Sequence, residues 1–201
     1  LTGFKWIADL INKNDEKEFI IGGEESYGYL ISDFVRDKDA ISASVLLAEA
    51  ASYFKENGSS FYEELLKLYS KFGTHLDSLL SIVKKGKKGD EEIREIMRNL
   101  RSKTPKKLGS YKVKKILDYQ LGQAKNIISG EFTKIKLPKS NVLQFIMENN
   151  DRITVRPSGT EPKIKYYFNV IGKPINLHDK NSYNIIAERL NERIKNYKTS
   201  I

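Results

Sequence analysis

The amino-acid sequence predicts an α/β layer followed by an α+β domain, in which helices pack on a mainly antiparallel sheet. In residues 1–102, segments with helical spacing alternate with short apolar runs, as they do in α/β layers. Residues 103–110 interrupt the apolar pattern with Lys, Pro and Gly, which is typical of a linker. In residues 111–201, strand-like runs come first and an amphipathic helix comes last. We therefore predict a partial α/β domain, a linker and a C-terminal α+β domain with these boundaries.

The first third of the chain supplies a helix, a strand and a second helix. Residues 4–11 place Phe, Ile, Leu and Ile at helical spacing, and the apolar run at residues 18–21 reads as a strand stopped by two glycines. Apolar residues recur at helical spacing again between residues 41 and 54, and Gly58 follows that segment. We predict that the second helix ends at this glycine.

A capping box and a glycine delimit the third predicted helix. Ser60 and Glu63 have the spacing at which the two side chains cap a helix start, and Gly73 lies where that helix would end. Residues 76–83 then read as a strand, and apolar side chains at i, i+3, i+4 and i+7 predict a helix over residues 93–100.

The second half contains three strand-like runs before its helix. These are residues 111–119, 141–147 and 164–170, and the helix over residues 183–197 carries an apolar face. Apolar and polar side chains alternate along the third run, which implies one buried face and one solvent-exposed face. Lys165 would then lie on the solvent-exposed face, beside the loop that precedes the strand.

Composition restricts the class of protein. The chain has 201 residues, which suffices for two ordinary domains, and its 39% hydrophobic residues can form a core. It has no apolar run long enough to span a membrane and no signal-peptide pattern, so we expect a cytoplasmic protein without a membrane partner. Because cysteine is absent, disulfides, thiolate metal sites and cysteine nucleophiles are excluded. The chain begins with Leu1 rather than Met, which indicates a piece of a longer protein with an incomplete first sheet.

The net charge of +9 allows three interpretations. Clustered Lys and Arg bind nucleic acid by releasing counterions, but the densest cluster here is only the run at residues 84–88. Elsewhere Lys and Arg alternate with Asp and Glu, which favours a solvated surface. Attraction of a small anionic substrate is the third interpretation, intermediate between the other two. We expect no nucleic-acid partner. His75 and His178 lie in separate segments without partners at ligand spacing, so no metal site is expected in the chain.

Two loops carry residues suited to ligand binding. In residues 156–160 (RPSGT), an arginine, two hydroxyls and a glycine that lets backbone N–H groups approach an anion all suit phosphate. A plain turn is the alternative, since Pro, Ser and Gly favour turns for backbone reasons. Residues 22–29 (GGEESYGY) place carboxylates that can accept hydrogen bonds from sugar hydroxyls, and a solvated acidic turn is the alternative.

Taken together, the two loops resemble the two C-terminal signatures of the α-D-phosphohexomutases. The run at residues 22–29, followed by DFVRDKDA at residues 33–40, is most similar to the bacterial phosphoglucomutase branch, and TGFK at residues 2–5 agrees. The resemblance covers nearly the whole chain. It implies four domains in the parent enzyme, of which this chain holds most of the third and all of the fourth.

The resemblance also implies a reaction in which a phosphoserine and a bisphosphorylated sugar exchange phosphate, interconverting glucose 1-phosphate and glucose 6-phosphate. Mg²⁺ and glucose 1,6-bisphosphate would serve the parent enzyme, and none would be bound by this chain itself. Neither the family's Ser-His-Asn-Pro loop nor its Asp-Gly-Asp-x-Asp-Arg metal loop occurs in the sequence. We therefore expect this chain to be inactive alone and to need the missing N-terminal half as its partner. A phosphomannomutase, a phosphopentomutase and a non-catalytic module that binds sugar phosphates are the alternatives.

Site residues carry over only where the motifs match. Glu24 and Ser26 match the pair that binds the sugar hydroxyls, and Gly3 matches a position whose backbone lies close to the sugar. Lys38 matches a lysine proposed as general acid/base or charge stabiliser. Four residues match the loop that holds the non-reacting phosphate, namely Arg156, Ser158, Gly159 and Thr160. Lys165 stands where some relatives carry a second phosphate-binding arginine and would act as a point charge.

Overall fold

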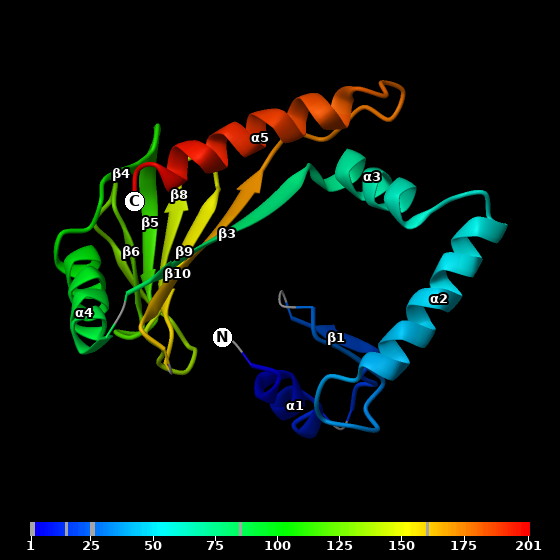
Figure 1. Cartoon of the computed structure of the whole chain (residues 1–201), viewed down its shortest axis with the longest axis horizontal. Helices are drawn as coiled ribbons and strands as arrows, with labels where there is room; N and C mark the ends of the chain where they lie inside the picture. The colour runs from blue at the N-terminus through cyan, green and yellow to red at the C-terminus, as the bar shows by residue number, and fades with distance from the viewer. Residues whose placement is uncertain (1–2, 15, 25–26, 85, 160) are drawn as a thin grey trace. The chain divides into compact units, whose positions relative to one another are not determined.

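The computed structural model describes residues 3–14, 16–24, 27–84, 86–159 and 161–201. The chain consists of two compact units, Leu1–Leu65 and Leu66–Ile201, and each is described by itself below (Figure 1). In the described residues, no helix is both long and apolar enough to cross a membrane.

The first unit contains two helices and a short antiparallel hairpin. Its elements are α1 (Lys5–Asn12), β1 (Ile21–Gly23), β2 (Tyr29–Ile31), α2 (Ala40–Glu56) and the start of α3 (Phe61–Phe72). β1 pairs with β2 from Ile21 opposite Ile31 to Gly23 opposite Tyr29, so the loop at residues 24–28 closes the hairpin. Phe4 and Leu30 are the large buried side chains of the described part of this unit. The strand therefore includes the two glycines that were expected to stop it.

The predicted capping box and both predicted terminal glycines are found at α2 and α3, and Asp39 adds a cap that was not predicted. Asp39 caps α2 by accepting hydrogen bonds from the backbone N–H groups of Ile41 and Ser42. At α3, the Glu63 N–H donates to Ser60 Oγ at 3.2 Å, which confirms the predicted cap. Gly58 and Gly73 follow the two helices with φ of +68° and +91°, in the left-handed region that favours glycine.

The second unit is built on an eight-stranded antiparallel sheet. The strands are β3 (His75–Val83), β4 (Lys107–Leu108), β5 (Tyr111–Asp118), β6 (Gln123–Asn126), β7 (Phe132–Lys134), β8 (Leu143–Met147), β9 (Arg152–Pro157) and β10 (Lys163–Ile171). Their order is β3-β10-β9-β8-β5-β6-β7, with β4 paired to β5. Two helices complete the unit, α4 (Gly86–Ser102) and α5 (Ser182–Lys198). The predicted α+β module with a mainly antiparallel sheet is thus confirmed.

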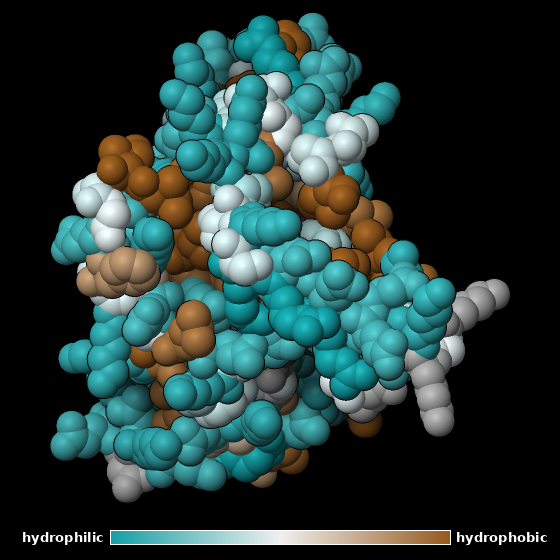
Figure 2. Space-filling model, turned by 90° about the vertical axis from the view of Figure 1, so that its left-hand side faces the viewer, coloured by the Kyte–Doolittle hydropathy of each residue, from teal (hydrophilic) through white to brown (hydrophobic). Residues whose placement is uncertain are grey.

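One face of this sheet forms the core. Met97 of α4 and Leu190 of α5 pack in the same buried cluster as Phe145 and Phe168 of the strands. Along β10 the side chains alternate between buried and part-exposed positions, which places Lys165 on the face away from this core, as predicted. Figure 2 views the side on which α4 lies in Figure 1, and hydrophobic atoms are visible there in a recess between hydrophilic side chains.

The division of the chain differs from the predicted boundary at residues 103–110. β3 pairs with β10 from His75 opposite Ile171 to Val83 opposite Lys163, and α4 joins the same core. Leu108 is buried and lies in β4, which pairs with β5. Residues 103–110 are therefore a connection inside the second unit, and residues 75–102 belong to that unit. The two compact units divide at Leu65 and Leu66, and the domain boundary at residues 103–110 stays a prediction from the sequence.

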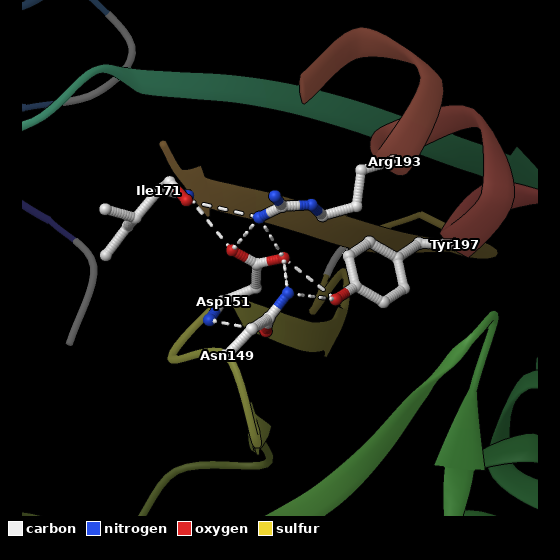
Figure 3. Close-up of polar contacts among 5 residues, drawn as sticks. All are labelled: Asn149, Asp151, Ile171, Arg193 and Tyr197. Atoms are coloured by element: carbon white, nitrogen blue, oxygen red, sulfur yellow. Dashed lines mark hydrogen bonds and ion pairs between the residues drawn. The ribbon is translucent and has the colours of Figure 1, made fainter. Parts of the chain in front are cut away.

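A buried carboxylate joins the β8–β9 turn to α5 (Figure 3). Asp151, which is fully buried, accepts hydrogen bonds from Arg193 Nη1 at 3.1 Å, from the Tyr197 hydroxyl at 2.8 Å and from Asn149 Nδ2 at 2.7 Å. The Ile171 N–H donates to the same carboxylate at 3.0 Å. Burial raises the pKa of the Tyr197 hydroxyl, which stays protonated as a donor.

Candidate functional site

In the first unit, two predicted site residues, Gly3 and Lys38, converge on the carboxylate of a third, Glu24. The backbone N–H of Gly3 donates to Glu24 Oε1 at 3.0 Å. Lys38 Nζ lies 4.0 Å from Glu24 Oε2 and 5.3 Å from the centre of the Phe4 ring. The Glu24 side chain is only 15% exposed, so its oxygens are held in place and still reachable from solvent.

The loop that carries Glu24 is fixed by its own backbone. The Glu24 N–H donates to the Gly28 carbonyl at 2.9 Å, and the Asp39 N–H donates to the Tyr29 carbonyl at 2.8 Å. A Cβ added at Gly28 would lie 2.1 Å from Lys38 Cδ, so the lysine stem passes directly over this glycine. The sequence therefore needs glycine at this position for Lys38 to reach Glu24.

Lys38 is held as a cation. Its ammonium lies 2.8 Å from Asp37 Oδ1. This hydrogen bond raises the pKa of Lys38, the charges of Asp37 and Glu24 raise it further, and desolvation opposes them. The same contact lowers the pKa of Asp37. A raised pKa favours the protonated amine, which can stabilise negative charge and releases its proton less readily.

In the second unit, the other predicted residues lie around the turn between β9 and β10. Arg156, near the end of β9, lies directly opposite Lys165 of β10 in the strand register. The Ser158 N–H donates to the Lys163 carbonyl at 2.8 Å, which closes the base of the turn. A Cβ added at Gly159 would meet nothing within 4 Å, so the turn is open at its tip.

Positive charge dominates this turn. Glu161 forms an ion pair with Lys163, which lowers the pKa of the Glu161 carboxyl by hydrogen bonding and by charge, and Lys165 lowers it further. Arg156 and Lys165 add two more cations on adjacent strands. With one carboxylate against three cations, the arrangement suits an anion bound by charge and by backbone N–H groups.

The structure thus gathers the predicted residues into two clusters, one in each unit. Ser26 and Thr160 lie outside the described residues. The first cluster contains Gly3, Glu24 and Lys38, and the second contains Arg156, Ser158, Gly159 and Lys165.

Sequence reasoning missed several supporting residues. Asp37 holds Lys38, Phe4 lies beneath its ammonium, and Gly28 makes room for its stem. The adjacency of Asp37 to Lys38 was the only available signal for the first contact, and the other two require the folded loop. In the described part of the chain, no three His, Asp or Glu side chains come together in a way that could hold a metal ion.

Comparisons with known proteins agree with the motifs. The family model for phosphoglucomutase/phosphomannomutase, alpha/beta/alpha domain III, matches residues 1–71. A phosphoglucomutase of Staphylococcus saprophyticus is 41% identical over 173 residues, which is 85% of this chain and 31% of the relative. A phosphoglucomutase of Staphylococcus epidermidis is 38% identical over 197 residues, which is 98% of this chain and 34% of the relative.

A solved structure agrees at the level of the fold. The open form of the exocytosis-sensitive phosphoprotein pp63/parafusin, a phosphoglucomutase from Paramecium, superimposes with a TM-score of 0.58 at 20% identity. The match covers 98% of this chain and 33% of that chain. The chain therefore spans about a third of the length of the relatives it matches. From these matches and the two signature loops, the chain belongs to the phosphoglucomutase/phosphomannomutase family and corresponds to the C-terminal part of a phosphohexomutase.

Proposed function

We propose that this chain is the sugar- and phosphate-recognising part of a cytoplasmic phosphoglucomutase. The parent enzyme interconverts glucose 1-phosphate and glucose 6-phosphate through a phosphoserine and a bisphosphorylated sugar. The observation that carries this proposal is the occurrence of both signature loops in a chain whose relatives are named phosphoglucomutase.

The first cluster is proposed to bind the sugar hydroxyls. The Glu24 carboxylate, already oriented by the Gly3 N–H, has lone pairs left for hydroxyl donors, and Ser26 would supply a second polar group. A carboxylate that accepts hydrogen bonds from two neighbouring hydroxyls can do so in either orientation of the ring. Such a site suits a sugar that must turn over between two phosphoryl transfers.

Lys38 is proposed to act beside the reacting oxygen. Its ammonium carries a full positive charge at neutral pH and can stabilise charge that develops on a phosphoryl or leaving oxygen. If it gives a proton to that oxygen in one direction, it must take the proton back in the other, as the predicted general acid/base role requires. Asp37 and Glu24 hold the ammonium in one position, which lowers the cost of ordering it.

The second cluster is proposed to hold the phosphate that does not react. Arg156 offers a planar pair of donors, Ser158 and Thr160 offer hydroxyls, and the backbone at Gly159 can approach an oxygen closely. Lys165 adds charge from the neighbouring strand. A phosphate bound here would fix the far end of the sugar while the near end reacts.

The chemistry of phosphate transfer itself is assigned to the missing N-terminal half. Mg²⁺ in the parent enzyme would neutralise the transferring phosphoryl group. The described residues of this chain include no cluster of ligands that fits a metal ion, so the N-terminal part would hold it. We therefore propose that the chain alone is inactive and that glucose 1,6-bisphosphate acts only in the assembled enzyme.

A phosphomannomutase is the second candidate, because the matching family model covers both sugars. The two differ at the 2-hydroxyl, which lies next to the phosphate at carbon 1. A non-catalytic module that binds sugar phosphates is the third candidate, and a phosphopentomutase is the fourth. All of them predict binding by the two loops, and they differ in sugar preference and in the response to an N-terminal half.

A two-dimensional NMR titration of this chain tests the proposal. We expect inorganic phosphate to shift amides at residues 156–161, and glucose 1-phosphate to shift these together with amides around Glu24. Ser158→Ala should weaken both ligands, whereas Glu24→Gln should weaken only the sugar phosphate. Mannose 1-phosphate and a short DNA duplex serve as comparisons. Shifts only at residues 84–88, and only with DNA, would overturn the proposal.

Reconstitution separates an enzyme from a binding module. The chain is mixed with the remaining N-terminal two-thirds of a phosphoglucomutase, and formation of glucose 6-phosphate is measured in the presence of Mg²⁺ and glucose 1,6-bisphosphate. Activity that appears only in the mixture and is lost with Arg156→Ala supports the mutase proposal. Binding without activity in any mixture would favour the non-catalytic module.

A further inference from the structure

Tyr27, in the loop that closes the β1–β2 hairpin, has a backbone conformation that is unfavourable for its side chain. Its φ is +65°, in the left-handed region, where a bulky residue is strained because its Cβ crowds the backbone. Glycine adopts this conformation freely, and the same run contains three glycines, at residues 22, 23 and 28. The loop therefore carries an aromatic residue at a position where glycine would suit the backbone better.

Hydrogen bonds of the loop hold Tyr27 in this conformation. The Tyr27 N–H donates to the Glu24 carbonyl at 3.2 Å, and the Glu24 N–H donates to the Gly28 carbonyl at 2.9 Å. Tyr27 is thus tied by its backbone to the residue whose carboxylate is proposed to bind the sugar.

Packing within the chain does not account for a tyrosine at this position. The residue is 88% exposed, and among the described residues its ring has no aromatic contact and its hydroxyl has no hydrogen-bond partner. Strained residues that the fold itself does not require are concentrated at sites that bind ligands. The strain at Tyr27 therefore indicates a contact that the chain by itself does not make.

An exposed aromatic ring beside a carboxylate suits a sugar. In a pyranose the hydroxyls point outward around the rim, and the C–H groups form an apolar face. The electron-rich face of an aromatic ring attracts these C–H groups, while a carboxylate accepts hydrogen bonds from the hydroxyls. A site that combines aromatic contact with a few polar groups is the usual composition of small-molecule sites.

We propose that Tyr27 is a further substrate-contacting residue, whose ring covers the C–H face of the sugar that Glu24 holds by its hydroxyls. The inference rests on the proposed sugar site, and it adds the requirement that the substrate be a cyclic sugar. A pyranose has C–H groups on both faces, so one aromatic ring can serve both orientations of a sugar that turns over. Inorganic phosphate has no such face and does not use Tyr27.

Glucose 6-phosphate is the probe for the test, with sorbitol 6-phosphate as its open-chain counterpart, and both are titrated into the 201-residue chain by NMR. We expect Tyr27→Ala and Tyr27→Gly each to weaken glucose 6-phosphate about fivefold and to leave inorganic phosphate unchanged. Tyr27→Phe keeps the ring and should change the affinity by less than about twofold. Tyr53→Ala, which removes an exposed tyrosine of α2, is the matched control and should have no effect.

Tyr27→Gly separates a contact with the sugar from a role in the shape of the loop. Glycine suits the left-handed backbone, so this variant should unfold at no lower temperature than the unsubstituted chain and yet bind the sugar phosphate more weakly. The preference for glucose 6-phosphate over sorbitol 6-phosphate should shrink by the same factor, whereas a merely loosened loop would weaken both ligands equally. The proposal is overturned if Tyr27→Gly binds as tightly as the unsubstituted chain, if the preference for the cyclic sugar is unchanged, or if Tyr27→Phe weakens binding as much as Tyr27→Ala.

Glu24→Gln distinguishes this inference from the function on which it rests. Weaker binding of glucose 6-phosphate with Glu24→Gln but not with Tyr27→Gly refutes the role of Tyr27 alone. Binding that neither substitution changes refutes the proposed sugar site together with it.

Discussion

Lys38 and Glu24 of the first cluster are positioned by neighbouring residues that contact no ligand in the proposed site. Lys38 reaches Glu24 because Gly28 leaves room for its stem and Asp37 holds its ammonium. Glu24 in turn is oriented by a backbone N–H rather than by a side chain. Substitutions at the supporting positions therefore test the geometry without removing any group that is proposed to bind.

Gly28→Ala should displace Lys38. The added methyl group would overlap the lysine stem, so the loop or the side chain must move. We expect the substitution at Gly28 to cost about 1 kcal/mol of stability in the first unit. Binding of glucose 1-phosphate should weaken while binding of inorganic phosphate stays unchanged. A double-mutant cycle with Lys38→Ala is the control, since the cost of Gly28→Ala should disappear once the stem is gone.

Gly159→Ala should weaken phosphate binding and leave stability nearly unchanged. The position has open space around a Cβ and lies outside the left-handed region, so we expect stability to change by no more than about 0.5 kcal/mol. A bound phosphate would occupy that space, and its affinity should fall about tenfold if the methyl group displaces one hydrogen bond. Thermal unfolding and phosphate titration measure the two effects. Unchanged phosphate affinity would mean that the anion does not approach this backbone.

Acid should loosen the start of α2 through Asp39. Hydrogen bonds from the Ser42 side chain and then from the Ile41 N–H lower the pKa of Asp39 below its usual 3.8. The charged cap therefore stabilises the helix above about pH 4, and this contribution is lost as the pH falls through the lowered pKa. Asp39→Asn keeps a capping oxygen that does not titrate, so its α2 amides should show a flatter profile between pH 5 and pH 2. Identical profiles for the two proteins in amide exchange would contradict this.

Strands β9 and β10 each serve two purposes because their side chains alternate. Val155 and Tyr166 face the core, and their chain neighbours Arg156 and Lys165 face away from it. The turn between them closes through the Ser158 N–H. The core packing of one face thus fixes the spacing of the cations on the other.

Much of this architecture was predictable from local signals. The spacing of apolar residues located α1, α2, α4 and α5, strand-like runs located β3, β5 and β8, and alternation located β10. The short strands β4, β6 and β7 were not predicted, because two to four residues carry too little pattern to distinguish a strand from a loop. β9 was not predicted as a strand, and only its last residues, Arg156 and Pro157, fall in the predicted phosphate loop.

Long-range pairing was beyond the reach of these signals. Nothing in residues 75–83 indicates that they pair with residues 163–171 rather than with the strands that precede them. In the same way, the two signature loops were found as motifs, but the contact of Gly3 with Glu24 joins residues 21 positions apart and needs the folded hairpin. The motifs predicted the candidate site residues, whereas the residues that contact them are evident only in the folded structure.

Asp151 should be the most sensitive polar position of the second unit. Its carboxylate is fully buried and joins the β8–β9 turn to Arg193 and Tyr197 of α5. Asp151→Ala would leave the half-buried Arg193 guanidinium and the buried Tyr197 hydroxyl without their partner, so we expect a loss of about 3 kcal/mol in the free energy of unfolding. Asp77→Ala is the matched control, because Asp77 bonds Asn169 at an exposed position and should cost about 1 kcal/mol or less. Similar costs for both in urea denaturation would contradict the assigned role of the cluster.

The two units differ in how much apolar surface they bury. The second unit has a continuous core that runs from Ile93 to Tyr197. In the described part of the first unit, Phe4, Leu30 and Ala43 are the buried apolar residues, while Ile41, Val45 and Leu47 of α2 are exposed. An amphipathic helix gains most of its stability from packing its apolar face. On this chain α2 therefore depends mainly on its own backbone hydrogen bonds and on the cap at Asp39.

Hydrogen exchange should reveal this difference directly. Amides of α1 and α2 should exchange through local openings of low free energy, whereas amides at the centre of β8, β9 and β10 should exchange only when the second unit unfolds. We expect protection at least about a hundredfold higher in the strands than in the helices of the first unit, a difference of about 3 kcal/mol. Asp151→Ala provides an internal control, since it should lower protection in β8–β10 and leave α1 and α2 unchanged. Equal protection in both units would mean that α2 has found a partner surface in solution, and the exposed residues Ile41, Val45 and Leu47 would then be the first positions at which to look for it.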